Sequence, residues 1–276
     1  MKKLGCYSDG YNLFPGLHII ERYFLEKESP LAVSHLTLQE LTQMLTHPSP
    51  DCHYVRCSAN YSRQLLNTLS IQPENVSFLG IFDCLIYEGN QWLPRLNYFS
   101  YLRALFVKKF KYHKINNAVA LICKANELPA LISFVVGLGH QQILIFNESG
   151  TLDDFSHVLK HSIGTDLKIY KYSDLTQVNI NTNLMINTID LESHTNLLGD
   201  LAYFNFMVQG GVVMDLYSST PVNPFLFEAE KADLSTMNRR EVVSYYDYGT
   251  LLKLGLISSF EREKYFQLYS EIATID

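Results

Sequence analysis

Two histidines have the spacing of metal ligands. His157 and His161 lie four positions apart in a segment with helical periodicity, so both would face the same side of one helix. No carboxylate stands between them in the arrangement that zinc hydrolases use, and two partly exposed helix histidines are the simpler interpretation. We expect no metal site in this chain.

The five cysteines are the next reactive side chains to consider. Their number is odd and no Cys-x-x-Cys pair occurs, which argues against a disulfide framework in a chain of this length. A nucleophilic cysteine needs a neighbouring base, and His53 is a conceivable partner for Cys57 or Cys84. Buried, unreactive thiols are the interpretation that we favour.

Composition and charge exclude several classes of function. The 276 residues are 47% hydrophobic and 18% charged, which is typical of a globular protein with a large core. The net charge of −6 argues against nucleic-acid binding, and the basic cluster Lys108, Lys109 and Lys111 lies where a predicted helix ends. The longest nearly apolar stretch, residues 128–139, is too short to span a bilayer. We therefore expect a cytoplasmic protein with neither a nucleic-acid nor a membrane partner.

Short strands and helices alternate in the first part of the chain. Thr37 and Glu40 form a capping-box pattern that predicts the start of a helix. The run Glu88-Gly-Asn90 separates two strand-like segments and predicts a hairpin. By hydrophobic periodicity the expected strands are residues 3–7, 31–36, 54–59, 81–87 and 91–96, and the expected helices are residues 14–24, 61–69 and 98–110.

The pattern of hydrophobic residues changes near residue 117. Residues 118–123 are an uninterrupted apolar run, typical of a buried parallel strand, and residues 128–138 are apolar nearly all round, which predicts a buried helix. Gly210 and Gly211 predict a turn before the last strand. The other expected elements are strands at residues 142–146, 167–172, 184–187 and 211–216, a helix at 151–161 and a helical tail at 246–272.

These elements predict a two-domain α/β protein, because strands separated by helices of this length form parallel sheets. One division falls near residue 110 and the other near residue 236. The chain would then have an N-terminal α/β domain at residues 1–110 and a doubly wound, Rossmann-like domain at residues 111–236. The helical tail, residues 237–276, is expected to pack back on the first domain. A cleft between two such domains is the default position for a ligand.

The second domain ends with a run that is similar to a known family. Gly210-Gly-Val-Val-Met-Asp-Leu-Tyr217 precedes a Thr-Pro segment, and the strand upstream ends in Asn187-Thr188. With the hairpin and the helix that follows it, this order resembles the shikimate dehydrogenase family over nearly the whole chain. The resemblance implies a substrate-binding first domain, an NADP-binding second domain and hydride transfer between the cofactor and a carbon that bears a hydroxyl.

The resemblance implies a cofactor loop directly after residues 118–123, where the family has Gly-Ala-Gly-Gly-Ala. This chain has Cys-Lys-Ala-Asn-Glu, so all three glycines are absent and Glu127 brings a negative charge toward a pyrophosphate. An acidic Glu148 after the next strand suits the ribose hydroxyls of NAD, although a solvated loop carboxylate is the alternative. If a dinucleotide binds at all, the family positions for it are Lys124, Asn126, Glu148 and Asn187.

The substrate positions implied by the resemblance also differ from the family. Asn12 and Phe14 stand where the family has two serines, and Asn60 or Tyr61 stands where it has its lysine. Asp83 replaces an asparagine before the hairpin, and Asn97 replaces the catalytic aspartate. Tyr61 and Asn97 thus occupy the catalytic positions, and we assign no catalytic residue. The residues expected to line the ligand cleft are Asn12, Phe14, Asn60, Tyr61, Asp83, Asn97 and Tyr217.

Three hypotheses about function follow from these substitutions. The first is a non-catalytic or repurposed protein that binds a small molecule in the interdomain cleft and holds no cofactor. The alternative is an oxidoreductase that uses NADP or NAD to act on shikimate or a related hydroxylated carboxylic acid. The third is a protein-binding module with an aromatic patch at Tyr245, Tyr246 and Tyr248, although packing of a C-terminal helix explains these side chains more simply. Under each hypothesis we expect a monomer or a homodimer.

Overall fold

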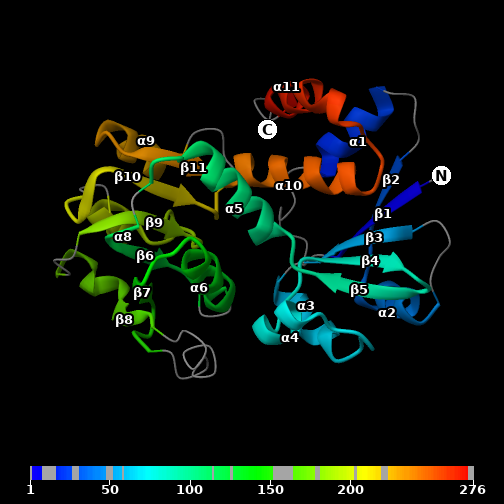
Figure 1. Ribbon diagram of the computed structural model, residues 1–276, viewed down its shortest axis with the longest axis horizontal. Coiled ribbons are helices and arrows are strands. Elements are labelled where there is room, and N and C mark those ends of the chain that lie inside the picture. Colours follow the sequence, from blue (N-terminus) through cyan, green and yellow to red (C-terminus); the bar gives the residue numbers. More distant parts are fainter. Residues whose placement is uncertain are drawn as a thin grey trace. The chain divides into compact units, whose positions relative to one another are not determined.

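The computed structural model describes residues 2–7, 17–26, 31–47, 52–57, 59–113, 115–124, 127–151, 164–177, 181–201, 204–218 and 223–272. The chain forms two compact units, residues 1–102 with 243–276 and residues 103–242 (Figure 1). Each contains one sheet, which confirms the expected two-domain α/β class. Both divisions fall within helices, α5 (Tyr98–Lys109) and α10 (Arg239–Lys253). A helix that continues from one unit to the next has no change of composition at the division, so the sequence locates these points only approximately.

The first unit is built on a five-stranded mixed sheet with the order β2-β1-β3-β4-β5. β1 pairs in parallel with β2 and β3, whereas β4 pairs antiparallel with β3 and β5. Gly89 and Asn90 have φ angles of 57° and 64°, as the tight turn of the predicted β4–β5 hairpin requires. The strands are β1 (Lys2–Tyr7), β2 (Leu31–His35), β3 (Cys52–Cys57), β4 (Cys84–Glu88) and β5 (Gln91–Arg95).

Helices cover both faces of this sheet (Figure 1). On one face Leu4 and Tyr54 share a core with Tyr23 of the first helix and Tyr265 of the last, and these two tyrosine rings lie 5.6 Å apart. The expected return of the C-terminal helices to the first domain is therefore confirmed. The other core lies under the capping-box helix, whose box is formed as predicted. The helices are α1 (Leu17–Glu26), α2 (Leu38–Thr46), α3 (Ala59–Leu66), α4 (Glu74–Leu79) and α11 (Arg262–Ile272).

The second unit contains a six-stranded, fully parallel sheet with the order β11-β10-β9-β6-β7-β8. The chain starts in the middle at β6, runs outward to β8 and then returns to β9 on the other side. The strand order therefore reverses between β6 and β9, which is the switch point where doubly wound sheets bind ligands. The strands are β6 (Ala118–Ile122), β7 (Gln142–Asn147), β8 (Asp166–Lys171), β9 (Thr182–Asn187), β10 (Met207–Asp215) and β11 (Ser235–Asn238).

Alternate residues of β6 face the helices on one side of this sheet. Ala118, Ala120 and Ile122 share a core with residues of two short helices, α8 (Thr195–Leu201) and α9 (Pro224–Lys231). Helix α6 (Leu128–Gly137) is buried along most of its length, as its sequence predicts. Among the described residues no helix combines the length and the apolar character needed to cross a bilayer.

The structure differs from the sequence-based expectation around β10. The turn expected at Gly210 and Gly211 lies inside this strand, where the pairing register with β9 shifts between Met207 and Val212. Gly210 has a φ of 74°, which glycine adopts without strain. The two glycines therefore form an irregularity within β10 and do not precede the strand. The predicted helix at residues 151–161, with His157 and His161, lies outside the described residues except for Thr151.

Two histidines of the second unit form a buried pair. The Nε2 atoms of His113 and His140 are 3.2 Å apart, and Nδ1 of His140 lies 3.4 Å from the carbonyl oxygen of Asn117. The ring of Phe106 packs edge-on against His113. Burial, together with the neighbouring His140, lowers the pKa of His113 to about 4. Burial also lowers the pKa of His140. Both rings are therefore neutral in the folded protein at neutral pH.

We expect the free energy of unfolding to fall as the pH is lowered from about 7 toward about 5, since the unfolded chain binds protons that these two histidines refuse when folded. The variant His113→Gln should lose roughly 1 kcal/mol of this pH dependence. Chemical denaturation at the two pH values measures the effect in both proteins. An unchanged pH dependence in the variant would contradict the neutral-pair interpretation.

Candidate functional site

In the first unit, Asp83 lies where β3, β4 and β5 meet. Its backbone N–H donates to the carbonyl of Arg95 at 2.9 Å, and its own carbonyl accepts from the N–H of Cys57 at 2.8 Å. The Asp83 carboxyl accepts from the N–H of Tyr98, at the first turn of α5, and from the Tyr246 hydroxyl at 3.3 Å. The backbone of Asp83 is therefore fixed by Cys57 and Arg95. Its carboxyl is held by the N-terminus of α5 and by a side chain of α10.

Beneath Asp83 lies a buried ion pair. Arg56 of β3 donates to Asp247 of α10, and their side chains are 2% and 0% exposed. The Arg56 guanidinium also lies 4.6 Å from the centre of the Tyr246 ring. The hydroxyls of Tyr246 and Tyr54 are 2.9 Å apart. A continuous polar network thus runs from Tyr54 through Tyr246 to Asp83, alongside the ion pair.

Two carboxyl groups and one guanidinium share this network, so its formal charge is negative when both acids are ionised. Burial raises the pKa of Asp83, and the N–H donors of Tyr98 and Asn97 offset this only in part. Tyr101 lies close by, and its pKa is raised to about 12 by burial, followed by the proximity of Cys84, Tyr245 and Asp83. The electrostatic environment of this site therefore disfavours anions.

A carboxyl and an amide lie side by side at this edge of the sheet. The side-chain amide of Asn97 donates to the sulfur of Cys84 at 3.4 Å, and the backbone of Asn97 is hydrogen bonded to Asp83. Compared with the pattern implied by the family resemblance, the acid and the amide have exchanged positions. Both side chains are partly exposed, so a ligand could reach them.

Several expected site residues of the first unit cannot be tested against this geometry. Asn12 and Phe14 lie outside the described residues. Asn60 and Tyr61 belong to the first turn of α3, but their side chains are outside the described part of the structure. Cys57 and Cys84 are buried, and His53 is exposed and stacks on Tyr87, so the thiol interpretation favoured from the sequence agrees with their burial.

Sequence reasoning missed Arg56 and Asp247 and considered Tyr246 only as part of an aromatic patch, although one signal was available. Arg56 is a charged residue in the buried, otherwise apolar second half of its strand, and a buried charge requires a partner. Gly249 is a further missed residue, because a Cβ atom there would lie 2.0 Å from the Tyr101 ring. The absence of that atom lets Tyr101 lie against α10.

In the second unit, the switch point between β6 and β9 contains the carboxyl of Glu127. One of its oxygens is buried and has no hydrogen-bond partner among the described residues. Burial raises the pKa of Glu127, offset by a hydrogen bond with Thr188 at the end of β9 and by the charges of Lys124 and Arg239. Lys124 itself is exposed at the end of β6. The carboxyl therefore points toward the region where a doubly wound fold would hold a pyrophosphate.

Other polar groups gather along the same carboxyl edge. The Tyr172 hydroxyl donates to the carbonyl of Cys123 at 3.4 Å, and Glu148 is exposed directly after β7. Asn187, an expected cofactor position, is fully buried and donates to Ile189 and Asp215 at 2.9 and 3.1 Å. Asn126, the remaining expected cofactor residue, lies outside the described residues.

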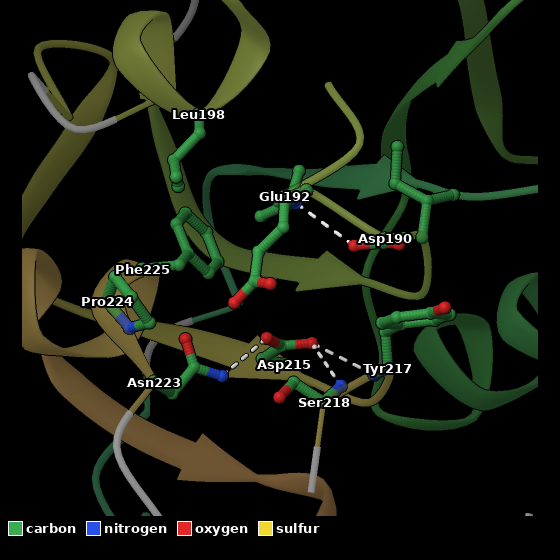
Figure 2. Close-up of a pocket in the computed structure, with 11 residues that line it drawn as sticks. Asp190, Glu192, Leu198, Asp215, Tyr217, Ser218, Asn223, Pro224 and Phe225 are labelled. Carbon is green, nitrogen blue, oxygen red and sulfur yellow. Dashed lines mark hydrogen bonds between the residues drawn. The ribbon is translucent and has the colours of Figure 1, made fainter. Parts of the chain in front are cut away.

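A pocket of about 190 Å³ opens where β9 and β10 end (Figure 2). Asp215 forms part of its wall, is 3% exposed and accepts from the side-chain amide of Asn223 at 2.6 Å. Burial raises the pKa of Asp215, and its hydrogen bonds offset this in part. Tyr217 is 39% exposed on the pocket wall. The other lining residues are Ile189, Asp190, Leu191, Glu192, Leu198, Ser218, Pro224 and Phe225.

The variant Asp83→Asn should raise the free energy of unfolding by roughly 1 kcal/mol near neutral pH. A carboxyl whose folded pKa is raised destabilises the folded state once the pH exceeds its ordinary value, and asparagine keeps an acceptor for Tyr98 without the charge. The gain should vanish below about pH 3, where the wild-type carboxyl is protonated in both states. Urea titrations at the two pH values test this, and a loss of stability at neutral pH would contradict it.

The variant Gly249→Ala should lower the free energy of unfolding by about 1–3 kcal/mol, because the new methyl group overlaps the Tyr101 ring. Gly199→Ala is the matched control, since Gly199 is also helical and nothing lies within 4 Å of its Cβ position. The control should be neutral or more stable. Thermal unfolding of the two variants separates the effect of crowding from that of helix propensity, and equal shifts would contradict it.

Comparisons with known proteins agree with this geometry at the level of the fold. The sequence matches no protein family profile and no curated protein. The structure is similar to shikimate dehydrogenase of Mycobacterium tuberculosis, with a TM-score of 0.74, 12% identity and coverage of 98% of this chain and 100% of the other. It is similar to 5-ketofructose reductase of Gluconobacter sp. strain CHM43, with a TM-score of 0.73, 14% identity and 98% coverage of each chain.

A third similar structure is shikimate 5-dehydrogenase of Listeria monocytogenes, in complex with shikimate and NAD. Its TM-score is 0.68 at 11% identity, and the alignment covers 89% of each chain. Identities this low establish architecture and not activity. The chain therefore has the two-domain fold of the shikimate dehydrogenases.

Proposed function

We propose that this chain is a small-molecule-binding protein on the shikimate dehydrogenase fold, without a dinucleotide and without hydride transfer. The observation that supports this most directly is the Glu127 carboxyl at the switch point of the parallel sheet. A doubly wound sheet holds a dinucleotide at this edge only if backbone N–H groups and small side chains let two phosphates approach a helix N-terminus.

The chemistry around Glu127 argues against a bound pyrophosphate. A carboxyl group at the N-cap of α6 repels phosphate when it is ionised, and when it is protonated its side chain still narrows the space through which a phosphate would approach. The positive charges nearby, Lys124 and Arg239, already act on Glu127 itself. The Tyr172 hydroxyl, bonded to the carbonyl that follows β6, adds further bulk to this edge. NAD and NADP thus do not fit the residues present.

The acid–base residues of the parent reaction are also missing. No lysine occurs between Cys57 and Ser70, and the amide of Asn97 does not exchange a proton as a carboxyl does. Loss of a general acid or base alone slows a reaction by about 10²–10⁴-fold. A protein that lacks both the proton-transfer group and the cofactor loop retains a folded, polar site that can bind without reacting.

An oxidoreductase remains the second candidate, and two observations favour it. Asp83, a partly exposed residue, has its carboxyl next to Asn97, so an acid is still present at this edge of the first sheet. Glu148 is exposed after β7, where an acidic residue suits the ribose hydroxyls of NAD. Under this alternative the substrate would be shikimate or a related hydroxylated carboxylic acid.

Calorimetric titration of NADP and NAD into the purified protein distinguishes the two candidates. We expect no heat of binding at about 1 mM of either dinucleotide for the wild type. The variant Glu127→Ala should bind more tightly, by about tenfold, because it removes the charge that opposes phosphate. Glu230→Gln is the control, since Glu230 is exposed on α9 and its contact with Thr236 needs only an acceptor.

Micromolar binding of either dinucleotide to the wild type would overturn the proposal. It would favour the oxidoreductase, and an assay of shikimate oxidation would then be the next measurement. Binding that is equally weak in the wild type and in Glu127→Ala would mean that the lost glycines, and not the carboxyl, exclude the cofactor.

A further inference from the structure

The pocket at the ends of β9 and β10 has an apolar wall. Leu191 and Leu198 line it, and Leu198 belongs to α8. Phe225 belongs to the first turn of α9 (Figure 2). Its volume of about 190 Å³ is below that of drug-sized sites, so it suits a ligand of few heavy atoms. Ligands of doubly wound sheets bind at the carboxyl ends of the strands, which is where this pocket lies.

The charged side chains that line the pocket are all carboxylates. They are Asp190, Glu192 and Asp215, and no lysine, arginine or histidine is among the lining residues. Arg239 donates to the carbonyl of Tyr217 at 2.9 Å but does not line the pocket. An anion entering this space would meet only like charges, so the pocket selects against carboxylates and phosphates.

Asp215 is a fixed carboxylate on the pocket wall. Its oxygens accept from Asn187 at 3.1 Å, from Asn223 at 2.6 Å and from the backbone N–H groups of Tyr217 and Ser218 at 2.9 and 3.3 Å. These donors stabilise the ionised form and orient it before any ligand arrives. Asp215 therefore provides a rigidly held carboxyl group at a buried strand end, where these donors counteract the burial that raises its pKa.

Glu192 supplies the second carboxylate. Its backbone N–H is held by the Asp190 carboxyl at 3.0 Å, and its side chain turns into the pocket on the side of Asp215 and Asn223 (Figure 2). The Glu192 side chain is exposed and forms no ion pair within the described part of the chain. Two carboxylates that share one small pocket repel each other, and a cation between them would remove this repulsion.

The residues that line the pocket suit an organic cation better than a metal ion. Within the described residues, no group of three or more His, Cys, Asp or Glu side chains is arranged to hold a metal. The leucine and phenylalanine wall instead suits a hydrocarbon body. A ligand with one ammonium group and a short apolar part matches both halves of the pocket.

We propose that the pocket between the ends of β9 and β10 binds a small organic amine, whose ammonium group lies between Glu192 and Asp215 and whose apolar part lies against Leu198 and Phe225. This rests on the proposed function, because it assigns a ligand to the carboxyl edge that a dinucleotide would otherwise occupy.

Three probes of the same shape and different charge test the proposal. They are 2-phenylethylammonium, the neutral 2-phenylethanol and the anionic 3-phenylpropanoate, titrated by calorimetry and by thermal shift into the whole chain. We expect the ammonium to bind about tenfold more tightly than the alcohol, and the anion not to bind, at concentrations up to about 10 mM.

Variants localise the site. Glu192→Gln should weaken binding of the ammonium by about tenfold and leave binding of the alcohol unchanged, because only the charge is removed. Glu230→Gln, an exposed acid of the same unit outside the pocket, should change neither. Since Glu192 is exposed, its variant is expected to fold, and an unchanged thermal unfolding midpoint without ligand verifies this.

Three results would overturn the amine assignment. They are no ammonium binding at about 10 mM, equal binding of ammonium and anion, and ammonium binding that Glu192→Gln leaves unchanged. A divalent cation that binds while the ammonium does not would likewise overturn it in favour of a metal. None of these bears on the dinucleotide titration, so the proposed function can stand when the amine assignment fails. Micromolar dinucleotide binding with the amine results as expected would overturn only the function.

Discussion

The buried ion pair between Arg56 and Asp247 organises the first unit. Its partners lie 191 positions apart in the chain, on β3 and on α10, so the pair joins α10 to the centre of the N-terminal sheet. Removing one member of a buried pair leaves an uncompensated charge and costs about 3–5 kcal/mol. The position of Tyr246 next to Arg56, and through its hydroxyl that of the Asp83 carboxyl, depends on this arrangement.

The surroundings of that pair determine what the first site can hold. Asp83 stands at the edge of a network with more acids than bases, and burial raises its pKa. Tyr101 reaches the same region because α10 has a glycine beneath its ring. A protein that only needed a stable core would replace such groups by apolar ones at little loss. The position of Asp83 and Tyr101 beside this buried pair is consistent with the small-molecule site that we propose.

The second unit separates what its fold requires from what dinucleotide binding requires. A parallel sheet requires only apolar strands and right-handed connections, and both are present at 11–14% identity to the dehydrogenase and reductase structures. Dinucleotide binding requires in addition a turn without side chains at one helix N-terminus. At that point this chain has Glu127, and further along the same edge the pocket lining has Glu192 and Asp215. A pyrophosphate is an anion, whereas acidic side chains along the carboxyl edge of this sheet favour a cationic ligand.

The sequence by itself determined the features that depend on neighbouring residues. The apolar runs predicted β6 and α6, and the capping box and the tight turn predicted the start of α2 and the β4–β5 hairpin, because each of these is stabilised by contacts within a few positions. The loss of the glycines and of the lysine is likewise visible in the sequence. Only the tertiary structure decided which partner Arg56 has, that Tyr246 holds Asp83 from 163 positions away, and that the Glu127 carboxyl is buried beside Thr188. Such contacts follow from the packing of distant elements, which local periodicity does not encode.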